Sequence, residues 1–95
     1  IEKILVEEGD TVQNGQLIGA GLKNRIKEDF FIITSSRASY EMVQKIAYLN
    51  LKLLVAISAP TGLAIRLAEN LGITLVGFAR ESRYTIYSHN ERIIE

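Results

Sequence analysis

Residues 30–45 read FFIITSSRASYEMVQK, and this stretch decides the fold because an apolar run passes directly into polar turn residues and then into a helical pattern. The same arrangement follows in residues 51–61, LKLLVAISAPT, and a third apolar run passes into a polar turn in residues 73–83, ITLVGFARESR. A continuous apolar run suits a strand that is buried on both faces. Strands that alternate with helices favour right-handed crossovers and a parallel sheet. The sequence therefore predicts an α/β fold whose strands occupy the apolar runs: residues 30–34, 51–57 and 73–78.

Helices are expected between these strands, and their ends carry capping signals. Ser35 or Ser36 can cap the first helix, and Ser58 can cap the second, with Pro60 in its first turn. Gly72 is the expected stop of the second helix. Apolar side chains at helical spacing are expected to face the core. They are Ala38, Met42, Val43, Ile46 and Ala47 in the first helix, and Leu63, Ala64, Leu67, Ala68 and Leu71 in the second.

Shorter elements are expected on both sides of this core. Residues 1–6 read as a strand, and residues 16–26 have a helical spacing that two glycines weaken. Residues 84–87 alternate like a partly exposed strand that pairs antiparallel with the strand before it. We expect one domain over residues 1–95, with a divergent N-terminal strand and helix in residues 1–29, and we expect it to be the C-terminal part of a longer protein.

Composition narrows the classes of function. Eleven basic and eleven acidic residues give a formal net charge of zero, which does not favour a nucleic-acid partner. The chain has no cysteine, so disulfide and thiol chemistry are excluded within these residues. Hydrophobic residues make up 47%, as in globular domains, and no apolar stretch reaches the length of a membrane span. We therefore expect a globular protein with neither nucleic acid nor membrane as its partner.

The three segments at the strand ends are the candidate binding site, since ligands of open α/β sheets bind where loops and helix N-termini gather. The first choice is the run after the third strand, which comprises Phe78, Ala79, Arg80, Glu81, Ser82 and Arg83. Arginine can grip phosphate oxygens through two nitrogens, and a phenylalanine ring can stack on an aromatic ligand. The alternative is a solvated turn with two surface arginines.

The two other segments hold the same place on their own strands. Ser36 and Arg37 precede the first helix, where free backbone N–H groups attract anions. Ser58 and Thr61 occupy the corresponding position before the second helix. In both segments, ordinary helix capping explains the serine as well as ligand contact does.

His89 is the single histidine, and we interpret it as a structural or surface residue. One histidine with Asp10 and Asp29 and no cysteine does not make a convincing zinc site. No G-x-S-x-G nucleophile elbow occurs, so a Ser–His–Asp triad is not expected. We therefore expect neither a catalytic residue nor a metal ligand in this chain.

The order and the amino-acid sequences of these segments resemble the C-terminal half of the FdhD family, the formate dehydrogenase accessory sulfurtransferases. The resemblance runs from Phe30 to Ile93 and is strongest over residues 36–45, 55–61 and 71–80. It ends in the pattern Tyr87-Ser88-His89-x-x-Arg92-Ile93. The combination is highly specific, whereas any one of these segments alone would be weak.

The resemblance implies a cytidine-deaminase-like α/β fold, a three-layer-type sandwich with a mainly parallel sheet, without the cysteines of the deaminase zinc signature. It also implies that the loop from Phe78 to Arg83 binds the guanine-nucleotide end of the molybdenum cofactor, bis-molybdopterin guanine dinucleotide. The segments with Ser36, Arg37, Ser58 and Thr61 would line the same site.

In the FdhD family, a cysteine pair in the other half of the protein carries persulfide sulfur from a cysteine desulfurase to the cofactor, which then goes to formate dehydrogenase. That step needs a thiolate, and this chain has none. We therefore expect the chain to bind and position the cofactor and not to transfer sulfur alone. The resemblance further implies a cytoplasmic homodimer with formate dehydrogenase and the cysteine desulfurase as partners.

Several positions depart from the family. Ser36 replaces the glycine of a Ser-Gly-Arg segment, and Glu81 and Ser82 stand where glycine is usual; a glutamate there would repel a diphosphate. An Arg-His-Asn segment is missing from residues 1–29. These departures favour an alternative, a non-catalytic oligomerisation or docking module. A rival match of residues 4–18 to the opening hairpin of a biotinyl/lipoyl domain is interpreted as coincidental turn chemistry, because no modified-lysine motif follows.

Overall fold

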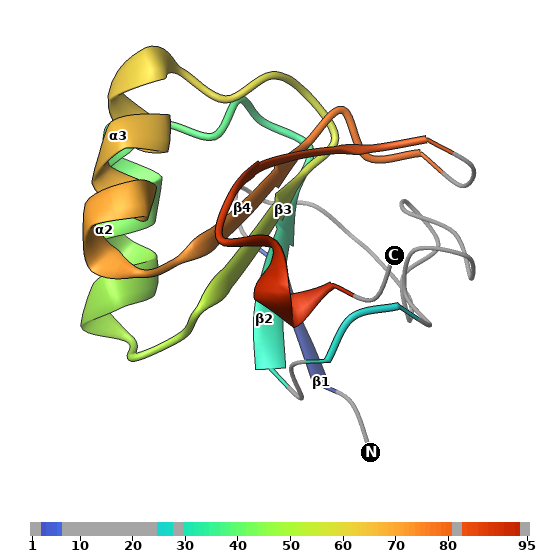
Figure 1. Ribbon diagram of the computed structural model, residues 1–95, viewed down its shortest axis with the longest axis horizontal. Coiled ribbons are helices and arrows are strands. Elements are labelled where there is room, and N and C mark those ends of the chain that lie inside the picture. Colours follow the sequence, from blue (N-terminus) through green and yellow to red (C-terminus); the bar gives the residue numbers. More distant parts are fainter. Residues whose placement is uncertain (1–2, 7–24, 28–29, 81–82, 94–95) are drawn as a thin grey trace.

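The computed structural model describes residues 3–6, 25–27, 30–80 and 83–93, which form one sheet with helices packed against it (Figure 1). The strands are β1 (Lys3–Val6), β2 (Phe30–Thr34), β3 (Leu53–Ala56), β4 (Thr74–Gly77) and β5 (Thr85–Ser88), in that spatial order. Strands β1 to β4 run parallel, and β5 runs antiparallel to β4. The predicted α/β fold with a mainly parallel sheet is confirmed, as is the antiparallel pairing of the last strand.

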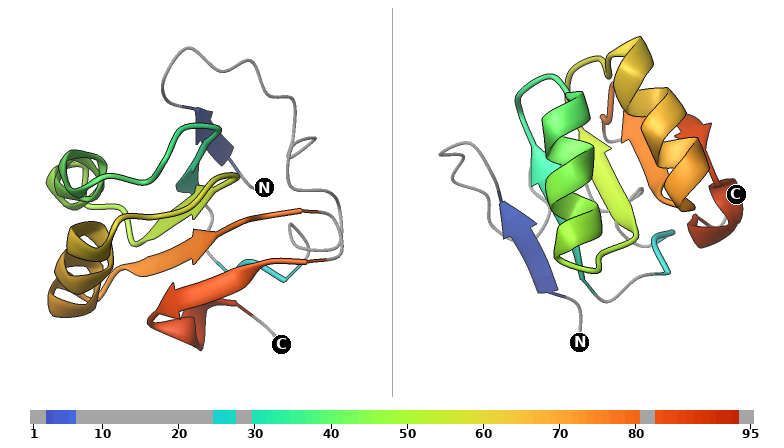
Figure 2. Two further views of the ribbon diagram at one scale, coloured as in Figure 1. Left: turned by 90° about the horizontal axis from the view of Figure 1, so that it is seen from above. Right: turned by 90° about the vertical axis from the view of Figure 1, so that its left-hand side faces the viewer.

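The helices α2 (Tyr40–Tyr48) and α3 (Gly62–Leu71) lie side by side on one face of the sheet (Figure 2). A short 3-10 helix, η1 (Asn90–Arg92), follows β5. Alternate strand residues pack under α2 and α3 because successive side chains of a strand point to opposite faces. The cluster on this face has these fully buried members: Ile32, Ala38, Val43, Ile46, Leu54, Ala56, Ala64, Ala68 and Leu75.

The opposite face of the sheet is also apolar. Its buried cluster joins the other strand residues with side chains from the connecting segments: Phe31, Ile33, Leu53, Val55, Val76, Ile26, Ala79 and Ile93. Ile26 and Ile93 pair as an isolated antiparallel bridge. Strands β2, β3 and β4 are therefore buried on both faces, as their continuous apolar runs predict, and each large side chain so buried stabilises the fold by about 1.5–3 kcal/mol.

Both helices begin later than the sequence suggests. Ser39 caps α2 and Thr61 caps α3, where the prediction placed the caps at Ser35 or Ser36 and at Ser58. The reason is that Ala38 and Pro60 pair as an isolated parallel bridge beyond the ends of β2 and β3. The backbone there stays extended, so Pro60 does not enter the first turn of α3. The prediction of these two caps is wrong.

The predicted core face of α3 is partly wrong as well. Ala64 and Ala68 are fully buried and Leu67 is half-buried, but Leu63 is 58% exposed and Leu71 is also exposed. In α2, Met42, Val43 and Ile46 are buried as expected. Gly72 ends α3 with φ 72°, which confirms the predicted left-handed stop.

The flanking segments are described only in part. Strand β1 confirms the strand expected in residues 1–6. The helix predicted over residues 16–26 lies mostly outside the described residues, and its last residue, Ile26, is in a bridge instead of a helix. In the described ranges, neither α2 nor α3 has the length and apolar character needed to cross a membrane.

Candidate functional site at the carboxyl edge of the sheet

Three loops meet at the carboxyl ends of β2, β3 and β4, as expected for a parallel sheet. We call them the first loop (residues 35–39), the second loop (residues 57–61) and the third loop (residues 78–83). The amide of Ile57 donates to the carbonyl of Thr34 over 2.9 Å, which joins the second loop to the end of β2. The amide of Phe78 donates to the carbonyl of Ser58 over 3.1 Å, which joins the third loop to the second.

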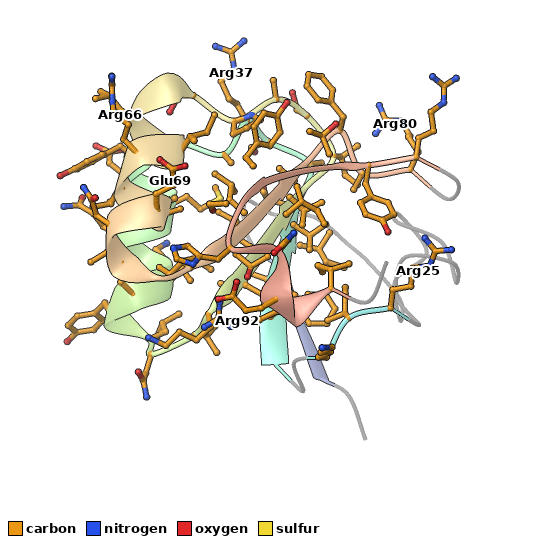
Figure 3. The ribbon with its side chains drawn as sticks, viewed as in Figure 1. Arg25, Arg37, Arg66, Glu69, Arg80 and Arg92 are labelled. Carbon is orange, nitrogen blue, oxygen red and sulfur yellow. The ribbon has the colours of Figure 1, made fainter. Side chains whose placement is uncertain are left out.

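The first loop turns sharply after β2. The amide of Ser36 donates to Oγ1 of Thr34 over 3.0 Å, and Ser36 itself is half-buried. Arg37 is exposed, and Figure 3 shows its side chain pointing away from the fold at the upper edge of that view. The first loop therefore presents one cation, while Ser36 belongs to the turn that supports it.

The second loop is fixed by two hydrogen bonds of its last residue, one from the backbone amide and one to the side chain. The amide of Thr61 donates to the carbonyl of Ala38 over 2.9 Å. Its Oγ1 accepts from the amide of Ala64 over 3.1 Å, which is the cap of α3. The Thr61 hydroxyl oxygen thus already has a structural role, and Ser58 contributes its carbonyl to the neighbouring loop.

The third loop begins with a strained residue. Phe78 has φ 52°, a left-handed conformation that is rare for a bulky side chain and costs on the order of 1–3 kcal/mol. Phe78 is 48% exposed, whereas the next residue, Ala79, is fully buried, and the Ala79 amide donates to the carbonyl of Ala56 over 3.0 Å. The backbone hydrogen bonds of Phe78 and Ala79 therefore hold an exposed aromatic ring at the edge of the sheet.

Arg80 and Arg83 close the third loop. The amide of Arg80 donates to the carbonyl of Arg83 over 2.6 Å. Nη1 of Arg80 donates to the carbonyls of Ile57 and Ala79, each over 2.9 Å. The Arg83 side chain is exposed. Glu81 and Ser82, which the sequence analysis also predicts as site residues, lie outside the described residues.

The carboxyl edge is therefore both cationic and apolar. Besides Arg37, Arg80 and Arg83, it carries exposed large side chains where α2 and α3 begin, Tyr40 and Leu63, together with Phe78. Figure 3 shows Arg37 and Arg80 along the same edge, with Arg66 of α3 beyond Arg37. Such a surface can attract an anion and also cover an aromatic ring.

Sequence reasoning missed the close contact behind this edge. Gly77 ends β4, and a Cβ at this position would lie 2.7 Å from Cδ of Pro60 and 2.8 Å from Cε2 of Tyr87. The glycine lets the second loop and β5 approach the end of β4. A glycine directly after an apolar run, followed by a phenylalanine, was the signal that could have indicated it.

The opposite edge holds a second polar cluster around the turn after β5. Thr74 is fully buried; its hydroxyl donates to the carbonyl of His89 and accepts from Nη1 of Arg92 over 3.0 Å. Nε2 of His89 lies 2.8 Å from the carbonyl of Glu69, which supports the structural interpretation of His89. A backbone hydrogen bond, with help from His89 and Arg92, lowers the pKa of the exposed Glu91 carboxyl.

No group of three or more His, Cys, Asp or Glu side chains suited to a metal ion occurs in the part of the chain that the structure describes. The described structure is therefore an α/β fold with a cationic and aromatic edge built from loops after parallel strands, and the carboxyl edge is where open α/β sheets commonly bind ligands.

Comparison with known proteins then gives the family. The sequence model of the FdhD/NarQ family matches residues 15–94, so this chain belongs to the FdhD/NarQ family. It is 52% identical over 79 residues to a sulfur carrier protein FdhD of Xanthomonas euvesicatoria pv. vesicatoria, covering 82% of this chain and 28% of that protein. It is 46% identical over 79 residues to the sulfur carrier protein FdhD of Shewanella oneidensis, covering 83% of this chain and 28% of that protein. The chain thus spans just over a quarter of the length of these curated relatives.

A solved structure agrees with the fold. The chain superposes with a TM-score of 0.63 on a crystal structure of a protein assigned as a formate dehydrogenase accessory protein from Desulfotalea psychrophila. The two are 31% identical, and the match covers 65% of this chain and 28% of that one. The resemblance on which the sequence analysis relied is confirmed at the level of the family.

Proposed function

We propose that this chain is the cofactor-binding part of an FdhD-type sulfur carrier that serves formate dehydrogenase maturation. It holds the guanine-dinucleotide end of the molybdenum cofactor, the cargo of the family, while the cofactor receives sulfur. The observation that carries the proposal is the joining of three loops at the carboxyl edge, which present Arg37, Arg83 and Phe78 as exposed residues.

The residues at this edge suit that ligand. Among the described residues, neither the Arg37 nor the Arg83 guanidinium has a hydrogen-bond partner, so each can offer its planar donors to phosphate oxygens. The ring of Phe78 offers a face on which a guanine can stack. The negative charge of a diphosphate and the flat ring of a purine would thus meet complementary groups from the first and third loops.

Sulfur transfer itself is assigned to residues outside this chain. A thiolate is the nucleophile in persulfide exchange, and the chain contains no cysteine. In the proposal, a cysteine desulfurase supplies sulfur to cysteines elsewhere in the sulfur carrier, and formate dehydrogenase receives the cofactor. The homodimer and the cytidine-deaminase-like character of the complete fold stay predictions.

Isothermal titration calorimetry with GDP, a stand-in for the guanine-dinucleotide end, tests the proposal. We expect micromolar binding to the unmodified chain and loss of at least about tenfold in affinity for the Arg37→Ala, Arg83→Ala double variant. Arg66→Ala, which removes an exposed arginine of α3, is the matched control and should bind like the unmodified chain. No heat at millimolar GDP, or an unchanged affinity in the double variant, would contradict the proposal.

A second candidate function is a docking or oligomerisation module, and one observation favours it. The helical layer leaves Tyr48 89% exposed, together with Leu63 and Leu71, and exposed apolar side chains of this kind can contact a second protein surface. Native mass spectrometry with and without GDP separates the two candidates. A dimer whose mass and abundance are the same with and without GDP, and which carries no bound nucleotide, favours the docking module.

A further inference from the structure

Arg80 makes contacts that differ from those of the other arginines at the carboxyl edge. Its Nη1 donates to the carbonyl of Ile57, twenty-three positions earlier in the chain, and to the carbonyl of its neighbour Ala79, both over 2.9 Å. One nitrogen of the guanidinium therefore bridges the second and third loops. Hydrogen bonds from a charged donor are about twice as strong as neutral ones, so this bridge adds a charge-assisted link to the backbone bond between Phe78 and Ser58.

The bridge lies next to Phe78, whose backbone is strained. Phe78 is held at φ 52° by the hydrogen bond from its amide to the carbonyl of Ser58. The amide of Ala79 donates a hydrogen bond to the carbonyl of Ala56. A bulky residue in the left-handed region persists only when its surroundings over-determine it. The Arg80 bridge comes from the residue that directly follows Phe78 and Ala79.

We infer that Arg80 is a positioning residue that clamps the third loop to the second, and that it is not itself the anion-binding arginine of this edge. Its guanidinium keeps Phe78 in the strained conformation that turns the ring outward. Anion contact then falls to Arg37 and Arg83, a division of roles that rests on the proposed function. The clamp itself rests only on contacts within the chain.

Amide hydrogen exchange of the ligand-free chain tests the clamp with two variants of Arg80. Arg80→Met keeps the apolar stem and removes the donor, whereas Arg80→Lys keeps a charged donor with three N–H groups. We expect exchange at the Phe78 and Ala79 amides to quicken by roughly three- to tenfold in Arg80→Met. Arg80→Lys should restore most of the protection. Arg83→Ala, in the same loop, is the control and should leave both amides unchanged.

GDP affinity is the second readout, because recovery of binding in Arg80→Lys would not be expected if Arg80→Met only destabilised the fold. We expect weaker binding in Arg80→Met and recovery in Arg80→Lys, because the lysine rebuilds the clamp. Unchanged exchange at Phe78 and Ala79 in Arg80→Met would overturn the inference. If exchange at Phe78 and Ala79 is unchanged and both variants lose GDP binding, Arg80 contacts the ligand directly, and the inference is likewise overturned. If the unmodified chain does not bind GDP, the proposed function fails while the exchange data still decide the clamp.

Discussion

Gly77 and Pro60 approach so closely that only glycine fits at the end of β4, where a Cβ would lie 2.7 Å from Cδ of Pro60. This contact seats the second loop against the base of the third, and the ring of Tyr87 closes the same space from β5. The shape of the carboxyl edge thus depends on a residue that has no side chain to offer a ligand.

Replacing Gly77 is therefore expected to damage the edge. Gly77→Ala should lower the free energy of unfolding by about 1–3 kcal/mol, because Pro60 and Tyr87 must both move to admit the methyl group. Denaturant unfolding measures the change. Gly62→Ala is the matched control, since nothing lies within 4 Å of its added Cβ, and it should be neutral or slightly stabilising. Equal effects of the two substitutions would contradict this account.

The corrected helix caps give a second prediction. Ser39 accepts from the amide of Met42 over 3.2 Å, and Thr61 accepts from the amide of Ala64. Ser39→Ala and Thr61→Ala should each cost about 0.5–2 kcal/mol of stability. Ser36→Ala should cost little, because Ser36 contributes a backbone amide and not a cap. A larger loss for Ser36→Ala than for Ser39→Ala in the same unfolding experiment would restore the original assignment of the cap.

Ser88 gives a third prediction, at the opposite edge. Its buried hydroxyl accepts from the amide of Leu75 over 3.1 Å and donates to the carbonyl of Ile73 over 2.7 Å, at the point where the pairing of β4 and β5 shifts register. Ser88→Ala leaves both backbone groups unpaired and should cost about 1–3 kcal/mol. Thr85→Ala, at an exposed position of the same strand, should change thermal stability much less.

The pKa of Glu91 makes stability depend on pH. Its ordinary value is 4.5, and the folded chain lowers it, mainly through a backbone hydrogen bond and then through His89 and Arg92. A carboxyl whose pKa is lower in the folded state stabilises the fold above its unfolded pKa, and this contribution is lost as pH falls through the folded value. The unmodified chain should therefore lose more stability than Glu91→Gln as the pH drops below 4.5. Parallel acid-unfolding curves for the two proteins would refute this.

The strands were predictable from the sequence, whereas the loop geometry was not. Continuous apolar runs such as residues 30–34 and 73–78 indicate buried strands because few other structures bury every side chain. The start of each helix depends instead on the Ala38–Pro60 bridge, which joins residues far apart in the chain and has no local signal. Local capping rules therefore favoured Ser58, although the pairing of Pro60 with Ala38 delays the start of α3 to Gly62.

The candidate site shows the same division. The loops could be located from their position after the strands, and Arg37 and Phe78 do lie at one edge, exposed. The bond from Arg80 to the carbonyl of Ile57 could not be foreseen, because residue type alone does not distinguish a clamp from a ligand contact. Likewise, the sequence places Leu63 and Leu71 on the same core face as Ala64 and Ala68, but only the two alanines are buried there.

The measurement that tests the central claim most directly is an NMR titration of the isotope-labelled chain with GDP. The account predicts that amide shifts concentrate in the first, second and third loops, from Ser36 to Ala38, from Ser58 to Thr61 and from Phe78 to Arg83, and saturate at micromolar GDP. The cluster around Thr74 and His89, at the other edge, should not respond. Shifts confined to that cluster or to the exposed face of α2 and α3, or no shifts at all, would contradict a nucleotide site at the carboxyl edge.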